Sequence, residues 1–395
     1  MPSRRNLRCG GPHAAPYGPV IEMAVSIDPT ASATSRSRAQ GSAPALRALA
    51  YVLAAAAALA VLGAGFGFER DSDWPRLLLA LIFIVGGGGA LIVLYLALDA
   101  LLQLAPPRWI RRLQPLLFVG PGLIMVGYFI ALPMLRTIIA SVYNRDGSTF
   151  IGLDNFVSIF TQPFMLVTFR NNLLWLVFGA GLTVVMGLAI AALADRSRFE
   201  RVAKAIIFMP MAISLVGAGI IWKFIYAVRD TSVPQIGLLN AIVTAFGGEP
   251  QAWIQLIQPW NNLFLIVIVI WLQTGYAMVL FSAAIKAVPT EILESARIDG
   301  AGELRVFFSI IVPSIRTTII AVSATVTIFT LKIFDVVLVM TGGQFGTDVI
   351  ATQFYNQYFV NRNAGLGSAI AVVLLVAVIP VILYNLRNFT RNKAL

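Results

Sequence analysis

The chain has 395 residues, of which 58% are hydrophobic and only 12% are charged, with a mean hydropathy of +0.83. Soluble domains carry about 25% charged residues, so this composition excludes an ordinary soluble protein and indicates an integral membrane protein. The single cysteine, Cys9, and the single histidine, His13, exclude a disulfide framework and a histidine-rich metal site. The pattern G-x-x-x-x-G-K-[ST] is absent from the sequence, so the chain is not itself a P-loop ATPase.

Residues 1–45 are rich in Pro, Gly, Ser, Ala and Arg and lack an apolar period, which predicts a disordered cytoplasmic tail. Met23 is an alternative start of translation within it. Beyond the tail, apolar runs long enough to cross about 30 Å of hydrocarbon as helices occupy residues 46–68, 77–104, 116–142, 172–194, 205–228, 263–284, 317–340 and 366–386. The predicted fold is therefore all-α, a polytopic bundle of about eight transmembrane helices.

The distribution of Lys and Arg predicts the orientation, because cytoplasmic loops carry an excess of these residues. The tail, the loops after the second, fourth and sixth runs, and the C-terminal end together hold 20 of them, whereas the opposite loops hold 6. Both termini and the loop 285–316 are predicted to be cytoplasmic. The net charge of +11 is thus explained by membrane topology, and no nucleic-acid partner is expected.

One stretch departs from the plain alternation of spans and loops. Residues 291–313, EILESARIDGAGELRVFFSIIVP, combine four acids and two arginines with apolar residues at helical spacing. Thr290 predicts a helix N-cap, Gly300 a tight turn, and Pro313 the end of a second helix over 304–311. The pattern predicts a helix-turn-helix at the cytoplasmic membrane face, and an ordinary connecting loop is the alternative.

The same stretch resembles the EAA motif of the permease subunits of binding-protein-dependent ABC importers. In that motif Glu-Ala-Ala, Gly, Ile and Leu-Pro recur at set spacings. The matching positions here are Glu294-Ser295-Ala296, Gly300, Ile310 and Val312-Pro313, with Ser295 and Val312 as mild departures. The resemblance implies a coupling helix that docks in a groove of a cytoplasmic ATPase. The coupling residues it implies are Glu294, Ser295, Ala296, Asp299, Gly300, Ala301 and Pro313.

Within this implied docking element, the residues divide into separate roles. Glu294 is expected to pair with a cation of the ATPase, and the apolar face of Leu293, Ala296 and Leu304 to bury in its groove. Gly300 permits the close turn.

The resemblance extends over the six spans from residue 116 onward and is strongest to sugar permeases of the maltose and α-glucoside type. The segments that carry it are GLDNF at 152–156, KIFD at 332–335 and MTGG at 340–343. It implies a type I ABC importer core at 114–395, preceded by two additional transmembrane helices at 46–113.

The partners that the resemblance implies are a second permease subunit, which completes a heterodimer, two cytoplasmic ABC ATPase subunits and an extracytoplasmic sugar-binding protein. ATP and Mg would be bound by the ATPase, and no cofactor or metal by this chain. The location implied is the plasma (inner) membrane of a prokaryote. The outer loops 143–170, 229–261 and 341–365 are either docking surfaces for the binding protein or plain surface loops.

Polar residues inside apolar spans are costly, so they serve either as contacts between helices or as parts of a pathway. Amides, hydroxyls and aromatic faces suit sugar hydroxyls. The candidates for a translocation cavity are Asn172, Gln273, Thr274, Tyr276, Thr327 and Asp335. Lys332 and Asp335 are three residues apart and are expected to share a helical face and pair.

The predicted function is that of a permease subunit of an ATP-driven sugar importer, without bond chemistry of its own, whose cargo is a di- or oligosaccharide such as an α-glucoside. The same machine carrying glycerol phosphate or a compatible solute is one alternative. An ion-driven secondary transporter is another, but the spans offer few acids beyond Asp99 and Asp335 for ion sites.

Overall fold

The computed structural model describes residues 48–57, 60, 76–195 and 197–392. These residues are almost entirely helical, and the β structure among them is one isolated bridge between Tyr143 and Phe150. The predicted all-α fold is confirmed. The predicted tail and most of the first apolar run lie outside the described residues.

The chain divides into two compact units, Met1–Tyr128 and Phe129–Leu395. The first contains a short apolar helix, Ala48–Ala57, followed by α3 (Arg76–Leu102) and α4 (Pro107–Val126). The boundary falls inside the third predicted span, at Tyr128. The predicted division into two additional spans and a six-span core stays a prediction.

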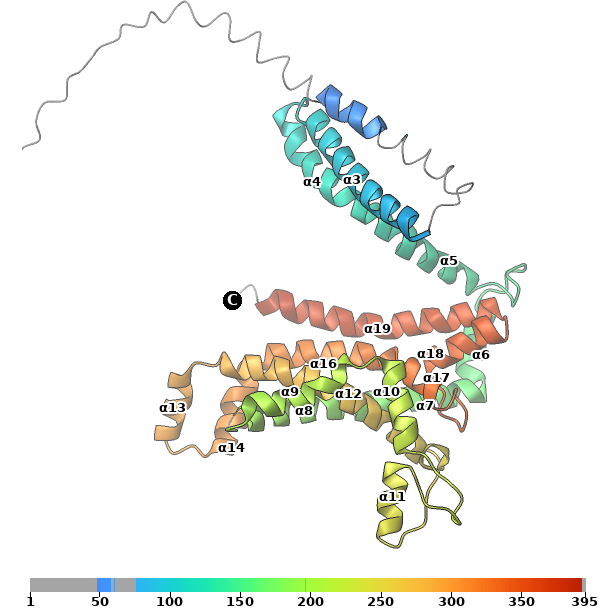
Figure 1. Cartoon of the computed structure of the whole chain (residues 1–395), viewed down its shortest axis with the longest axis vertical. Helices are drawn as coiled ribbons and strands as arrows, with labels where there is room; N and C mark the ends of the chain where they lie inside the picture. Colours follow the sequence, from blue (N-terminus) through green and yellow to red (C-terminus); the bar gives the residue numbers. More distant parts are fainter. Residues whose placement is uncertain (1–47, 58–59, 61–75, 196, 393–395) are drawn as a thin grey trace, which may run out of the picture. The chain divides into compact units, whose positions relative to one another are not determined.

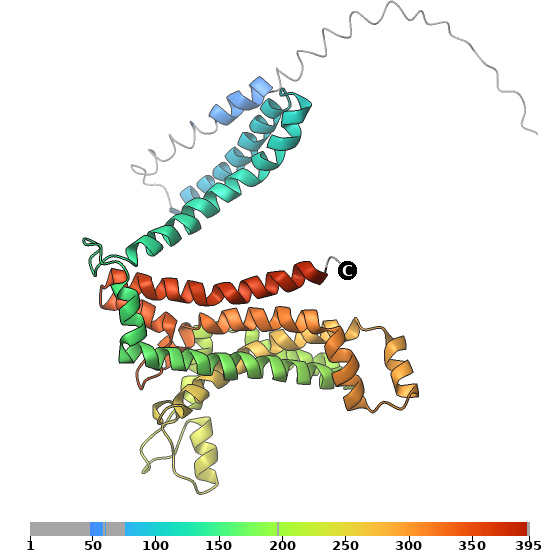
Figure 2. The same cartoon turned by 180° about the vertical axis from the view of Figure 1, so that it is seen from behind.

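The second unit holds the remaining helices (Figures 1 and 2). In chain order they are η1 (Gly127–Ala131, which begins just before the boundary), α5 (Leu132–Ala140), α6 (Asp154–Thr161), α7 (Pro163–Leu174), η2 (Trp175–Ala180), α8 (Gly181–Ala194), α9 (Glu200–Phe208), η3 (Met209–Ala212), α10 (Leu215–Ile225), α11 (Leu238–Ala245), η4 (Trp253–Gln255), α12 (Trp260–Lys286), α13 (Thr290–Ile298), α14 (Glu303–Val306), η5 (Phe307–Ile311), α15 (Val312–Ser314), α16 (Arg316–Leu331), α17 (Asp335–Met340), α18 (Ile350–Tyr355), η6 (Asn356–Val360) and α19 (Ala364–Asn392).

Six helical segments of the described residues are long and apolar enough to cross a membrane, or seven if one bent pair is a single span. They are Ile84–Leu102, Arg108–Ala140, Pro163–Ala194, Trp260–Lys286, Arg316–Met340 and Ala364–Asn388. The polytopic character is confirmed. The first predicted run, 46–68, falls mostly outside the described residues. The predicted orientation stays a prediction.

The fifth predicted span is not the single straight helix that its hydropathy suggests. It breaks into Glu200–Ala212 and Leu215–Ile225, which meet at 104°. Ile213 is extended, with ψ of 136°, and the Ser214 side chain caps the second helix by accepting from Gly217 N at 3.0 Å. Hydropathy alone does not report such a break, because the apolar run continues on both sides of it.

The helix α12 is the central element of the second unit, and half of the residues in its most apolar stretch are buried. Two glycines allow its neighbours to approach closely. A Cβ at Gly187 of α8 would lie 2.5 Å from the Ala277 Cβ, and a Cβ at Gly275 would lie 2.5 Å from the Ile207 carbonyl oxygen of α9. Small residues at such contacts are typical of membrane helix packing, and here they hold α8, α9 and α12 together.

Candidate functional site

The segment from α13 to α14 projects beyond the ends of α8, α12 and α16, at the end of the bundle opposite α17 and α18 (Figures 1 and 2). A turn at Gly300 joins the two helices. Gly300 has φ of +82°, and the amide of Ala301 donates to the Ala296 carbonyl at 3.0 Å, which satisfies the end of α13. No atom lies within 4 Å of the position of a Cβ on Gly300, so the backbone angle, not space, requires glycine.

Two local expectations for this segment are wrong. Thr290 is the first residue of α13, after Pro289, and its side chain does not cap the helix. Pro313 does not end the second helix, because the helical path runs on through α15, and the Ile315 amide donates to Ile311 at 3.0 Å. The π-helix η5 ends at Ile311, two residues before Pro313, and its wider turn accommodates the ring and its missing donor.

The apolar face of α13 is turned toward the permease itself. Leu293 and Ala296 pack against a buried cluster that contains Val306 and Ile311. This differs from the expected outward face of Leu293, Ala296 and Leu304. The apolar side chains that do face outward are Ile298, Leu304 and Phe308, which are 86%, 76% and 65% exposed.

A groove of about 260 Å³ lies beside two of these exposed side chains, Leu304 and Phe308. Its walls are apolar residues of α8 on one side and residues of α14 and η5 on the other, namely Ala189, Ala192, Leu193, Glu303, Leu304, Phe307 and Phe308. Solvent-facing apolar residues beside a groove are typical of a protein-protein contact.

Charged side chains hold the two short helices at a fixed angle. Arg297 Nε donates to Glu303 Oε1 at 2.8 Å and Arg297 Nη2 to Oε2 at 3.5 Å, across the turn. The bond to Glu303 raises the pKa of Arg297 above its usual value, and the nearby carboxylate of Glu294 adds to the effect. Sequence reasoning missed Glu303, although opposite charges on either side of Asp299-Gly300 were a visible signal.

The other predicted coupling residues lie on the same projection. Glu294, Ser295 and Asp299 are exposed, and Ser295 Oγ donates to the Ile292 carbonyl at 3.0 Å. Ala301 is half-buried against the cluster of Val306. The fold thus brings Glu294, Ala296, Gly300 and Pro313 into one segment, while their role in coupling stays a prediction.

The predicted cavity residues do not converge on one pocket. Thr274 lines a cavity of about 380 Å³, and its hydroxyl already donates to the Ile270 carbonyl at 2.6 Å. The other walls of this cavity are Met186, Ile206, Ile207, Pro210, Trp222, Val267, Ile270 and Trp271. Thr327 lines a different groove beside Pro380 and Tyr384.

Gln273 is half-buried on the same helix, α12, and Tyr276 packs against a cluster that includes Ala180 and Val322. Asp335 is the first residue of α17. Helix α16 ends at Leu331, so Lys332 and Asp335 do not share a helical face, and these two described residues form no ion pair with each other.

Asn172 is buried and bridges two other parts of the bundle. Its Nδ2 donates to the Leu331 carbonyl at 3.4 Å, and its Oδ1 accepts from the Ile350 amide at 2.8 Å. Its assignment to the cavity stays a prediction, but both ends of its amide are engaged in this conformation. Membrane helices use buried amides in this way to hold neighbours together.

Further buried asparagines, which sequence reasoning missed, hold the loop between α17 and α18. Asn171 Nδ2 donates to the carbonyls of Gly346 at 2.7 Å and Asp348 at 2.8 Å, and Asn261 Nδ2 donates to that of Phe345 at 2.7 Å. Burial raises the pKa of the Asp348 carboxyl above its usual range. The Asn171-Asn172 pair at the start of a span was the available signal.

The described residues form a multi-span helical bundle from which the α13–α14 segment projects (Figure 1). The family model of binding-protein-dependent transport system inner membrane components matches residues 183–392. The chain belongs to this family and is a permease subunit of an ABC importer.

Two relatives are similar over most of the chain. The osmoprotective compounds uptake permease protein of Synechocystis sp. is 49% identical over 71% of this chain and 100% of its own length. The alpha-glucoside transport system permease protein of Rhizobium meliloti is 47% identical over 72% of this chain and 85% of its own length.

A solved structure supports the fold. A chain of the bacterial alginate ABC transporter, in complex with an alginate pentasaccharide-bound periplasmic protein, superposes with a TM-score of 0.60 at 22% identity, over 70% of this chain and 94% of its own.

Proposed function

We propose that this permease imports a neutral glucoside, of the size of a di- or oligosaccharide, across the inner membrane of a prokaryote. It works with a second permease subunit, an extracytoplasmic binding protein and two cytoplasmic ATPase subunits that bind ATP and Mg. The chain itself binds no nucleotide. The observation that carries the proposal is the projecting α13–α14 segment, which matches the spacing of the EAA motif.

The geometry of this segment supports coupling to an ATPase. Ile298 and Leu304 face outward and each would gain about 1.5–3 kcal/mol if fully buried in a partner's groove. Glu294 presents an exposed carboxylate for a cation of the ATPase. Movement of the partner then passes to the permease through α13, because Leu293 and Ala296 pack on the bundle.

The cavity lined by Thr274 supports a neutral cargo. Trp222 and Trp271 lie edge to face there, with ring centroids 5.8 Å apart, and its walls contain no charged residue. Aromatic faces suit the apolar faces of sugar rings. The buried Nε1 of Trp222 has no hydrogen-bond partner among the described residues.

A compatible solute of the glucoside type is the second candidate cargo. The observation that favours it is the 49% identity to a permease named for osmoprotective compounds. The same neutral, aromatic-lined cavity would accept it, since both candidates present a sugar ring and hydroxyls. Glycerol phosphate is disfavoured, because no cation lines the cavity to offset its charge.

The test is uptake into proteoliposomes that contain the complete complex. We expect ATP-dependent uptake of a labelled α-glucoside, and no competition by excess sn-glycerol 3-phosphate. Trp271→Ala is expected to lower uptake about tenfold, which corresponds to about 1.4 kcal/mol. Competition by glycerol phosphate, or uptake driven by an ion gradient without ATP, would overturn the proposal.

A further inference from the structure

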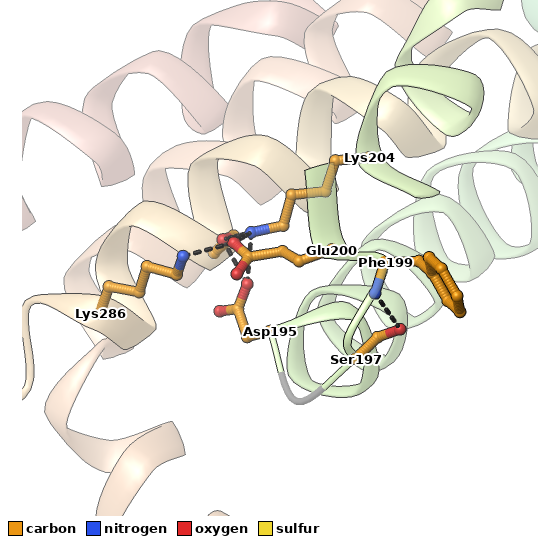
Figure 3. Close-up of polar contacts among 7 residues, drawn as sticks. Asp195, Ser197, Phe199, Glu200, Lys204 and Lys286 are labelled. Carbon is orange, nitrogen blue, oxygen red and sulfur yellow. Dashed lines mark hydrogen bonds and ion pairs between the residues drawn. The ribbon is translucent and has the colours of Figure 1, made fainter. Parts of the chain in front are cut away.

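A compact polar cluster lies at the end of the bundle from which α13 projects (Figure 3). Lys204 is its centre. The Lys204 ammonium donates to Glu200 Oε1 at 2.6 Å, and also to Asp195 Oδ1 and Ser282 Oγ. Ser282 in turn donates to Asp195 Oδ1 at 2.7 Å, and Lys286 pairs with Glu200. We call these five side chains the basal cluster.

The basal cluster joins three helices. Asp195 follows the last residue of α8, Glu200 and Lys204 belong to α9, and Ser282 and Lys286 belong to the last turn and a half of α12. Its two acids and two lysines balance in charge. The side chains of Asp195 and Lys204 are only 10% and 17% exposed, so loss of one partner leaves another charge poorly solvated.

The helices that the basal cluster joins are already in close contact farther along. The Gly275 contact with Ile207 and the Gly187 contact with Ala277 bring α9 and α8 against α12 near the middle of the bundle. The basal cluster adds a second point of attachment at the end. Two separated attachments prevent one helix from pivoting on another, which a single close contact would permit.

The joined helices connect the two functional regions of the chain. At one end, Lys286 is three residues from Pro289, which precedes α13, and Val288 between them is buried with Val306 and Ile311. At the other end, Ile206, Ile207 and Pro210 line the cavity that contains Thr274. These three residues belong to the segment Glu200–Ala212, which we call the α9 arm. Residues of α12 line the cavity as well, and displacement of α13 moves the wall formed by Ile206, Ile207 and Pro210 together with them only if α9 follows α12.

We propose that the basal cluster is a set of positioning residues that locks α8, α9 and α12 into one rigid lever. This lever carries the movement of α13 to the cavity wall formed by the α9 arm. The inference rests on the proposed ATP-driven import, and it assigns the transmission to Lys204 and its partners. The cluster stays closed throughout the transport cycle.

The first test measures solute imported per ATP hydrolysed by the complete complex. Lys204→Met is expected to lower this ratio about tenfold, because α13 moves with the ATPase while α9 lags. Lys204→Arg is expected to retain most of it. Arg201→Met is the matched control, since Arg201 is an exposed cation on the same helix and forms no ion pair with another described residue.

The ratio of solute imported to ATP hydrolysed distinguishes a coupling defect from a folding defect. A variant that only folds poorly yields fewer complexes but the same ratio for each one. An unchanged ratio in Lys204→Met would overturn the lever. If the wild-type complex shows no ATP-driven uptake at all, the proposed function fails instead, and the two failures are distinct.

The second test restores the attachment covalently. Glu200→Cys and Lys286→Cys are combined in a chain whose single cysteine is replaced by Cys9→Ser, and the pair is joined by a short thiol-specific cross-linker. A rigid lever predicts that the double variant is partly uncoupled and that cross-linking raises its ratio. Loss of uptake on cross-linking would show that the cluster opens during transport, and no change would show that the attachment is irrelevant. Either result would overturn the proposal.

Discussion

The guanidinium of Arg297 and the carboxylate of Glu303 face each other across the Gly300 turn, with Nε 2.8 Å from Oε1. The two side chains are 46% and 48% exposed, so solvent screens the pair and it adds little to stability. Its consequence is geometric, because it limits the angle between α13 and α14. Arg297→Gln and Glu303→Gln are each expected to lower uptake severalfold.

A double-mutant cycle on uptake checks this pair. If Arg297 and Glu303 act through each other, the double variant Arg297→Gln/Glu303→Gln loses no more uptake than either single variant. Losses that multiply would mean that the two side chains act separately, for example by contacting the ATPase independently.

The turn itself offers a comparison of two neighbouring glycines. Gly300 has φ of +82°, whereas Gly302 has φ of −66° and ψ of 156°, an ordinary conformation for a residue before a helix. Gly300→Ser is expected to cost about 1 kcal/mol and to impair uptake, and Gly302→Ser to be neutral because serine is a good N-cap. Gly300→Asn should be the milder of the two variants at this site. Equal effects of serine at both positions in uptake assays would contradict the account.

The two faces of the projecting segment predict different defects. Leu304→Asp places a charge on a side chain that is 76% exposed, so the permease should assemble normally and lose its ATPase subunits on purification. Leu293→Ala removes packing against the Val306 cluster. It should lower the free energy of unfolding of the permease itself by about 2 kcal/mol, seen as a lower melting temperature. Retention of the ATPase by Leu304→Asp would place the docking surface elsewhere.

A substitution at Asn172 tests whether its side chain holds neighbouring helices together or lines the translocation cavity. Asn172→Leu removes the bonds to the Leu331 carbonyl and the Ile350 amide, and each buried group left unpaired costs about 1–3 kcal/mol. A lower melting temperature with an unchanged apparent KM for uptake is the expected result. A raised KM at unchanged stability would instead support the assignment of Asn172 to the cavity.

The carboxyl of Asp348 predicts that the stability of the folded protein depends on pH. Burial raises the pKa of its carboxyl, and hydrogen bonds from Thr352 at 2.9 Å and Gln353 at 2.8 Å oppose the shift only in part. The folded state then binds this proton more tightly than the unfolded state. Its stabilising contribution is complete below the unfolded pKa of 3.8 and is lost as pH rises through the folded pKa.

Thermal unfolding followed between about pH 4 and pH 7 checks this sign. Asp348→Asn is expected to remove the part of the decline in stability that Asp348 causes, because an amide does not titrate in this range. An identical pH profile in the variant would assign the dependence to other groups.

The sequence alone determined the class of protein. A segment that crosses the hydrocarbon core of a membrane must contain a long apolar run, and such runs can be recognised in any sequence. The sequence also located the turn at Gly300, since a left-handed backbone angle demands glycine, and the spacing around it identified the family. Local rules were less reliable at Thr290 and Pro313, where the preceding Pro289 and the π-helix η5 gave the chain other ways to begin and continue a helix.

Tertiary structure decided which side of each helix is free and which polar groups meet. Leu293 and Leu304 are both apolar residues of the same motif, yet one packs on the bundle and the other faces outward. Lys204 and Ser282 are 78 residues apart, and Asn172 and Ile350 are 178 apart, so no local period relates them. Their pairing depends on the close approach of helices, which is set by the whole bundle rather than by any one segment.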